Sequence, residues 1–90
     1  MIVKKANDVA AEEVTAGEGT SRQVLLSADE GPNFAMRRFH MQPGGGMPNH
    51  TNTVEHEQYV LAGRATVGIG DEGITVQKDD VVFIPANVPH

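Results

Sequence analysis

Short hydrophobic runs rich in valine, isoleucine, threonine and phenylalanine alternate along the chain with clusters of glycine, proline, asparagine and aspartate. The turn-forming clusters recur at intervals of roughly eight to twelve residues, which is typical of an all-β sandwich or closed barrel. The strands predicted from this pattern are Arg22–Leu26, Asn33–Met41, Gln58–Ala62, Ala65–Ile69, Ile74–Gln77 and Val81–Ile84.

The predicted strands differ in the faces that they should bury. Residues Ala65–Ile69 alternate small or apolar residues with polar residues or glycine, as in a strand with one buried face. Val81–Ile84 is apolar throughout and predicts a strand that is covered on both faces. Only Asp8–Val14 has a helical pattern, and it is too short to be stable alone, so we expect a turn or an irregular arm there.

Length and composition exclude several classes of protein. The 90 residues predict a single domain spanning 1–90 with a small core, and without cysteine its stability must come from a metal, a partner subunit or regular β packing. The net charge is −5 and the lysines and arginines are scattered, which argues against a nucleic-acid partner. The sequence has no signal-peptide pattern and no apolar stretch of membrane-spanning length, so we expect no membrane partner and a cytoplasmic location.

Histidine is the residue type that points to chemistry. A single histidine in a β protein is usually a polar surface residue, but His50, His56 and His90 all lie at the ends of predicted strands or turns. His50 follows a turn rich in proline and glycine, where a strand would begin, so His50 and Asn52 would share a strand face. His56 has the same parity, and His90 follows a rigid turn with two prolines.

Two segments place these histidines at defined distances from turn residues. In the first, five residues separate Gly44 from His50, three separate Asn52 from His56, and six separate His56 from Gly63. The second segment has the positions Asp79, Pro85, Asn87 and His90, with five residues between the first two and two between the last two.

Together the two segments resemble the two motifs of the cupin family. In that family, His-x-His and a glutamate lie between the two glycines of the first motif, and Pro-x-Gly and a histidine follow the glycine of the second. Here Asn52 stands in place of the second histidine and His56 in place of the glutamate. Asp79 and Asn87 stand in place of the two second-motif glycines, and asparagine is the substitute that best tolerates a left-handed turn.

The chain is most similar to the small four-histidine manganese cupins of bacteria and archaea, which carry histidine at the glutamate position within a Glu-His-Glu triplet, here Glu55-His56-Glu57. The resemblance implies an all-β fold, a small double-stranded β-helix or jelly-roll barrel. It also implies one divalent metal held by His50, His56 and His90, with Asn52 at the fourth position. Manganese is the expected metal, and iron, nickel, copper and zinc are the alternatives.

The departures from the motifs leave alternatives open. An asparagine amide oxygen is a weaker ligand than imidazole, so Asn52 either binds weakly, binds through a water molecule, leaves an open position for catalysis, or only caps a turn in a relict site. Glu55 and Glu57 would point to the strand face opposite His56, and His40 is expected to be a surface or barrel-lining residue. The methionines Met36, Met41 and Met47 are expected to be barrel lining.

Cupin chains continue past the second-motif histidine into strands that complete the sheets, so this chain resembles a cupin without its C-terminal strands. We expect either a fragment of a longer chain, which is the simpler reading, or strands supplied by another chain. The expected function is a metal-dependent oxidoreductase acting with dioxygen or peroxide on a small organic substrate. The alternatives are a non-catalytic barrel that binds metal or a small ligand, and a relict site in a structural dimer. A homodimer is expected, with Ile2-Val3 as an exchanged edge strand.

Overall fold

The computed structural model describes residues 1–90 and consists of seven β-strands and one turn of 3-10 helix. The chain divides into two compact units, an N-terminal unit, Met1–Pro48, and a C-terminal unit, Asn49–His90. The predicted all-β class is confirmed, whereas the single domain over residues 1–90 stays a prediction. The structure has no helix with the length and hydrophobicity needed to span a bilayer.

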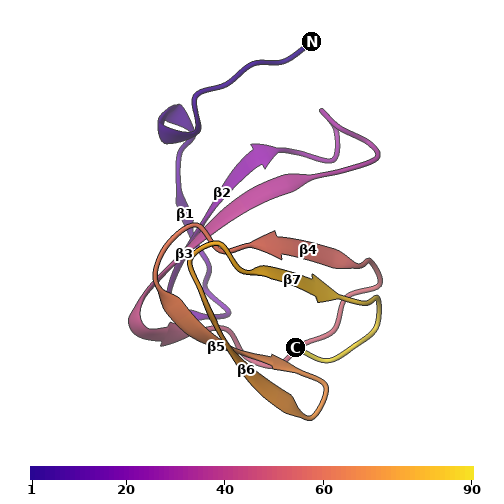
Figure 1. Ribbon diagram of the computed structural model, residues 1–90. Coiled ribbons are helices and arrows are strands. Elements are labelled where there is room, and N and C mark those ends of the chain that lie inside the picture. The colour runs from indigo at the N-terminus through magenta and orange to yellow at the C-terminus, as the bar shows by residue number, and fades with distance from the viewer. The chain divides into compact units, whose positions relative to one another are not determined.

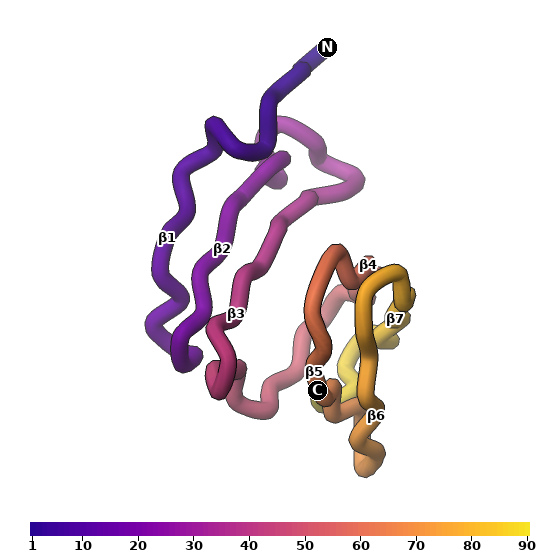
Figure 2. Tube along the Cα trace, turned by 60° about the vertical axis from the view of Figure 1, so that its left-hand side comes forward, coloured from indigo at the N-terminus to yellow at the C-terminus, as the bar shows by residue number.

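The N-terminal unit is a three-stranded antiparallel sheet in the order β1-β2-β3, visible as three adjacent segments in Figure 2. The strands are β1 (Glu12–Glu13), β2 (Glu18–Leu26) and β3 (Met36–Gly46). The strand expected from Asn33 begins only at Met36, because Phe34 donates its backbone N–H to the carbonyl of Gly31 and so remains in the preceding turn. The expected irregular arm is present, since the 3-10 turn Ala6–Asp8 is followed by the two-residue strand β1.

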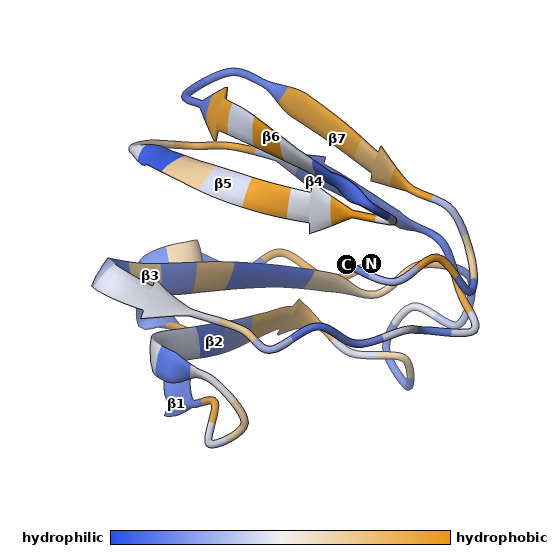
Figure 3. Ribbon diagram, turned by 90° about the horizontal axis from the view of Figure 1, so that it is seen from below, coloured by the Kyte–Doolittle hydropathy of each residue, from blue (hydrophilic) through white to orange (hydrophobic).

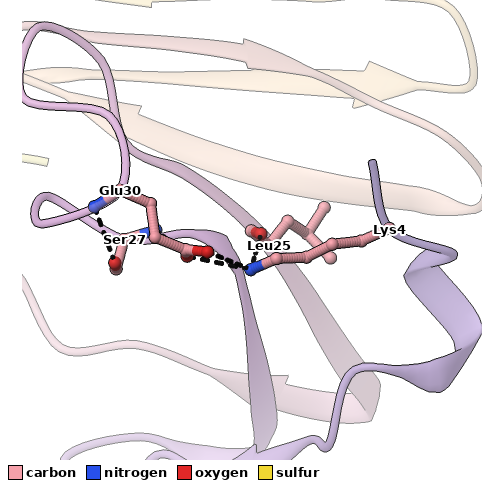
Figure 4. A network of polar contacts seen from close by, with 4 residues as sticks. All are labelled: Lys4, Leu25, Ser27 and Glu30. Atoms are coloured by element: carbon pink, nitrogen blue, oxygen red, sulfur yellow. Dashed lines mark hydrogen bonds and ion pairs between the residues drawn. The ribbon is translucent and has the colours of Figure 1, made fainter. Parts of the chain in front are cut away.

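Polar contacts attach the N-terminal arm to this sheet. The Lys4 ammonium donates to the carbonyl oxygen of Leu25 at 3.0 Å and forms an ion pair with Glu30 at 2.8 Å (Figure 4). The Glu30 carboxylate also accepts the backbone N–H of Ser27, and Lys4 and this bond lower the pKa of Glu30 below its usual value. The arm therefore joins the sheet through hydrogen bonds and charge, while Ile2 and Val3 remain exposed.

The C-terminal unit contains two antiparallel strand pairs, β4 with β7 and β5 with β6 (Figure 1). The strands are β4 (His56–Tyr59), β5 (Arg64–Ile69), β6 (Glu72–Gln77) and β7 (Val81–Ile84). Their core is a cluster of three buried side chains, Val76, Val82 and Ile84, with Val60, Val67 and Ile69 packed against it. Figure 3 shows β7 as hydrophobic along its length, consistent with its central part in this core.

The prediction that β7 is covered on both faces is wrong. Val82 and Ile84 are buried at 7% and 1% exposure, but Val81 and Phe83, which point to the opposite face, are 70% and 53% exposed. Only one face of β7 packs against the core, so the strand alternates as an antiparallel strand with one covered face does. A run of four apolar residues does not have the alternation that would have revealed this.

Left-handed backbone conformations occur at all four positions where the cupin motifs carry glycine. The φ angles are 81° at Gly44, 80° at Gly63, 73° at Asp79 and 65° at Asn87. Asp79 and Asn87 are the only residues other than glycine with positive φ in the chain. The expectation that Asn87 adopts a left-handed turn is confirmed, and the second-motif turns keep their shape without glycine.

Candidate metal centre

The turn after β7 positions His90 beside His50. Asn87 donates its backbone N–H to the carbonyl of Asn52 at 2.7 Å, and His50 and His90 exchange two backbone hydrogen bonds, each 2.9 Å long. This pair continues the register of β4 with β7, because five residues separate it from the His56–Ile84 pair on each chain segment. The strand expected to begin at His50 is absent, since the residues between His50 and His56 are not part of a strand, and His50 is joined to His90 by a backbone pair.

The imidazole of His90 lies against the other two predicted histidine ligands. Its ring centre is 4.3 Å from that of His50 and 5.5 Å from that of His56, with interplanar angles of 61° and 77°. His56 is the first residue of β4 and lies opposite Ile84, which is 1% exposed, so its ring adjoins the core face of the strand pair. The structure thus brings together three of the predicted ligands within one unit.

The hydrogen bonding of His90 defines its tautomer. Its Nδ1 lies 2.9 Å from the carbonyl oxygen of Val88, and because a carbonyl can only accept, Nδ1 must be the nitrogen that carries the hydrogen. In the neutral ring this leaves a lone pair on Nε2, which is buried and has no hydrogen-bond partner. An unsatisfied buried acceptor costs about 1–3 kcal/mol, and a backbone carbonyl on the far nitrogen is the usual support of a metal-bound histidine.

The arrangement fits a metal in donor type and ring spacing. Two imidazoles bound to one ion through nitrogens at about 2.1 Å have ring centres roughly 4.5–5.5 Å apart. The His56–His90 separation of 5.5 Å lies at the upper end of this range, and the His50–His90 separation of 4.3 Å lies just below its lower end. As the side chains lie, however, no group of three or more histidine, cysteine, aspartate or glutamate residues is in position to hold an ion. Binding therefore requires rotation of the imidazoles on a backbone that already brings them together.

Comparison with known proteins identifies the family. The sequence model described as cupin domain matches residues 37–90, which is more than half of the chain. This chain belongs to the cupin domain family. Among solved structures, the polyketide cyclase RemF from Streptomyces resistomycificus matches with a TM-score of 0.90 and 30% identity, over 100% of this chain and 67% of that one. A search of curated proteins found no match.

The RemF match also confirms the expected cupin jelly-roll fold, since it extends over the whole of this all-β chain. Membership of the four-histidine manganese subgroup stays a prediction. Within the cupin site, Asn52 is half-buried and its backbone carbonyl is bound to the amide of Asn87. This bond fixes the backbone of Asn52 beside the turn that carries His90.

The acidic residues next to His56 behave as outward-facing groups. Glu55 and Glu57 are exposed, and a hydrogen bond between the two carboxyl groups raises the pKa of Glu57 above its usual value. Glu57 lies opposite the exposed Phe83 in the β4–β7 register, on the face away from Ile84. The register agrees with the prediction that Glu57 points to the strand face opposite His56.

His40 lies in the N-terminal unit of the cupin, on β3, and is exposed. It lies opposite Ser21 in the β2–β3 register, and Ser21 lies opposite Glu13 in turn. Together with Gln42, these side chains line an open groove of about 300 Å³. The position agrees with the predicted surface role.

Sequence reasoning missed one residue of the site, Val88. It lies two residues before His90 in the turn, and its carbonyl oxygen orients the His90 ring.

Proposed function

We propose that this cupin binds one divalent transition-metal ion through His50, His56 and His90 and acts on a small organic substrate. The observation that carries the proposal is the buried Nε2 of His90, which lacks a hydrogen-bond partner and belongs to a ring in contact with two other imidazoles. The resemblance to four-histidine cupins favours manganese, with iron, nickel, copper or zinc as alternatives.

The residues of the chain prepare this site in three ways. The backbone pair fixes the spacing of His50 and His90, and the Val88 carbonyl holds the tautomer of His90 that leaves Nε2 open for binding. Three neutral imidazoles leave the charge of an ion uncompensated, and the Asn52 amide would add no charge. A bound ion of this kind supplies Lewis acidity and, for manganese or iron, redox chemistry.

Oxidation of the substrate with dioxygen or peroxide is the reaction that suits this residue set. Across from His56, the inner face of β7 carries the aliphatic side chains of Ile84 and Val82, and the nearby carboxyl groups of Glu55 and Glu57 lie on exposed positions. Without a general acid or base at the rings, hydrolysis and isomerisation are less favoured. The C-terminal unit also has a groove of about 210 Å³ lined only by apolar residues, large enough for part of a small organic molecule.

Cyclisation is a second candidate reaction. It is favoured by the match to a polyketide cyclase with a TM-score of 0.90 and 30% identity. The two reactions differ in their balance, since oxidation consumes dioxygen or peroxide and ring closure does not. Oxygen uptake measured together with the mass of the product distinguishes them on a panel of phenolic and polyketide-like substrates. A non-catalytic binding barrel and a relict site in a structural dimer remain the alternatives for a protein with no turnover.

Titration of metal-free protein with manganese tests the binding step. We expect His90→Ala to abolish binding, because it removes an imidazole that lies against both others and carries the unpartnered Nε2. His40→Ala is the matched control, since His40 is exposed on β3 of the N-terminal unit. Equal affinity of the two variants would contradict the proposed centre.

We also propose that the protein acts as a homodimer, because a chain of 90 residues has only a small core of its own.

A further inference from the structure

Gln58 lies on the same face of β4 as His56. In the β4–β7 register His56 lies opposite Ile84 and Gln58 lies opposite Val82. Side chains directly opposite one another in an antiparallel pair project to the same face. Ile84 and Val82 are buried at 1% and 7% exposure, so His56 and Gln58 both belong to the inner face of this strand pair.

Gln58 is the polar neighbour of the histidine centre on that face. Successive residues on one face of a strand are about 6.6 Å apart, which a glutamine side chain with three rotatable bonds can bridge toward a ligand held by the preceding imidazole. The amide of Gln58 makes no hydrogen bond or ion pair with another protein group, and the residue is exposed. Its oxygen is therefore available for a ligand.

We propose that the side-chain oxygen of Gln58 is a further ligand of the metal held by His50, His56 and His90. This inference rests on the proposed function and adds a residue that the family motif does not contain. An amide oxygen is a hard, neutral donor of the kind that suits manganese better than copper. It would supplement the weak donor at Asn52 without changing the charge of the site.

The test compares manganese affinity among variants of the full chain, measured by calorimetry on metal-free protein. Gln58→Leu removes the amide at similar volume and should weaken binding about tenfold or more. Gln77→Leu makes the same chemical change at an exposed position on β6, next to the buried Val76 and on the opposite face, and should leave affinity unchanged. Gln58→Glu replaces the amide with a carboxylate and should tighten binding by about tenfold or more.

His56→Ala separates this inference from the proposed centre. If His56→Ala loses manganese while Gln58→Leu binds within about twofold of Gln77→Leu, the centre stands and the role of Gln58 is refuted. If His56→Ala also keeps its affinity, the proposed centre itself is refuted. Circular dichroism of each metal-free variant establishes folding. Should Gln58→Leu fail to fold, unchanged affinity in Gln58→Glu would overturn the inference.

Discussion

Replacement of Asn87 tests the link between the second-motif turn and stability. Asn87 has a φ of 65°, and its side chain makes no hydrogen bond, so Asn87→Ala changes mainly the cost of the left-handed conformation. That conformation costs an ordinary residue about 1–2 kcal/mol, and asparagine adopts it more readily than most residues. We therefore expect Asn87→Ala to lower the free energy of unfolding by about 1 kcal/mol.

Asn87→Gly should behave differently. Glycine adopts positive φ without strain, but its more flexible unfolded chain costs about 0.5–1 kcal/mol on folding, so the two effects nearly cancel. A change of 1 kcal/mol shifts the midpoint of thermal unfolding by about 4–8 °C in a domain of this size.

Thermal unfolding followed by circular dichroism, with urea unfolding as a second measure, distinguishes these outcomes. Asn49→Ala is the control, because Asn49 does not have positive φ. The expected order of unfolding midpoints places Asn87→Gly close to the unaltered protein and Asn87→Ala below both. An Asn87→Ala protein as stable as the Asn49→Ala control would refute the left-handed turn as a source of strain.

The remaining predictions concern the site and its surroundings. Asn52→His should tighten metal binding in calorimetry, because imidazole is a better ligand than an amide, and should lower the turnover of any reaction that needs an open coordination position. His56→Ala should lose the metal in the same calorimetric titration. Metal affinity should fall as the pH drops below roughly 6.5, since imidazole must be neutral to bind, and equal affinity at pH 5 and pH 8 would exclude histidine as the main ligand. Tyr59 donates to Asp79 at 2.9 Å and has a pKa raised above 10.0, so Asp79→Asn should lower the midpoint of its spectrophotometric titration. The raised pKa means that the folded state favours the neutral phenol of Tyr59. The resulting contribution to the free energy of unfolding is present below the pKa of tyrosine in the unfolded chain, and it is lost as the pH rises through the pKa of Tyr59 in the folded protein.

The sequence predicted the fold well where glycine and proline mark the turns. Gly44 and Gly63 of the first motif have positive φ, and so do Asp79 and Asn87, which replace the glycines of the second motif. The turn-forming residues and the resemblance to the cupin motifs together located these bends. The ends of the strands were less predictable, because they depend on individual backbone hydrogen bonds. The residues after Tyr59 leave β4 because Val60 pairs its backbone with Asp79 and Asp80 in the facing turn.

The candidate site was predictable in its residues and not in its detail. The sequence could predict that His50 and His56 point to the same face of a strand. It could not predict that the backbone of His50 pairs with His90, forty residues away, instead of beginning a strand. The carbonyl of Val88 reaches Nδ1 of His90 only because the intervening turn folds back. No periodicity records such a contact, and none distinguishes the covered face of β7 from the exposed one.

The metal content of the purified protein tests the central claim most directly. It is measured by elemental mass spectrometry on protein that was prepared without a metal-affinity step. We expect about one divalent transition-metal ion per chain, with manganese as the leading metal, and loss of that ion from His90→Ala. Protein that carries no metal, and that binds none of manganese, iron, nickel, copper or zinc when each is added back, would contradict the account. In that case His50, His56 and His90 would form a relict cluster of imidazoles rather than a metal centre.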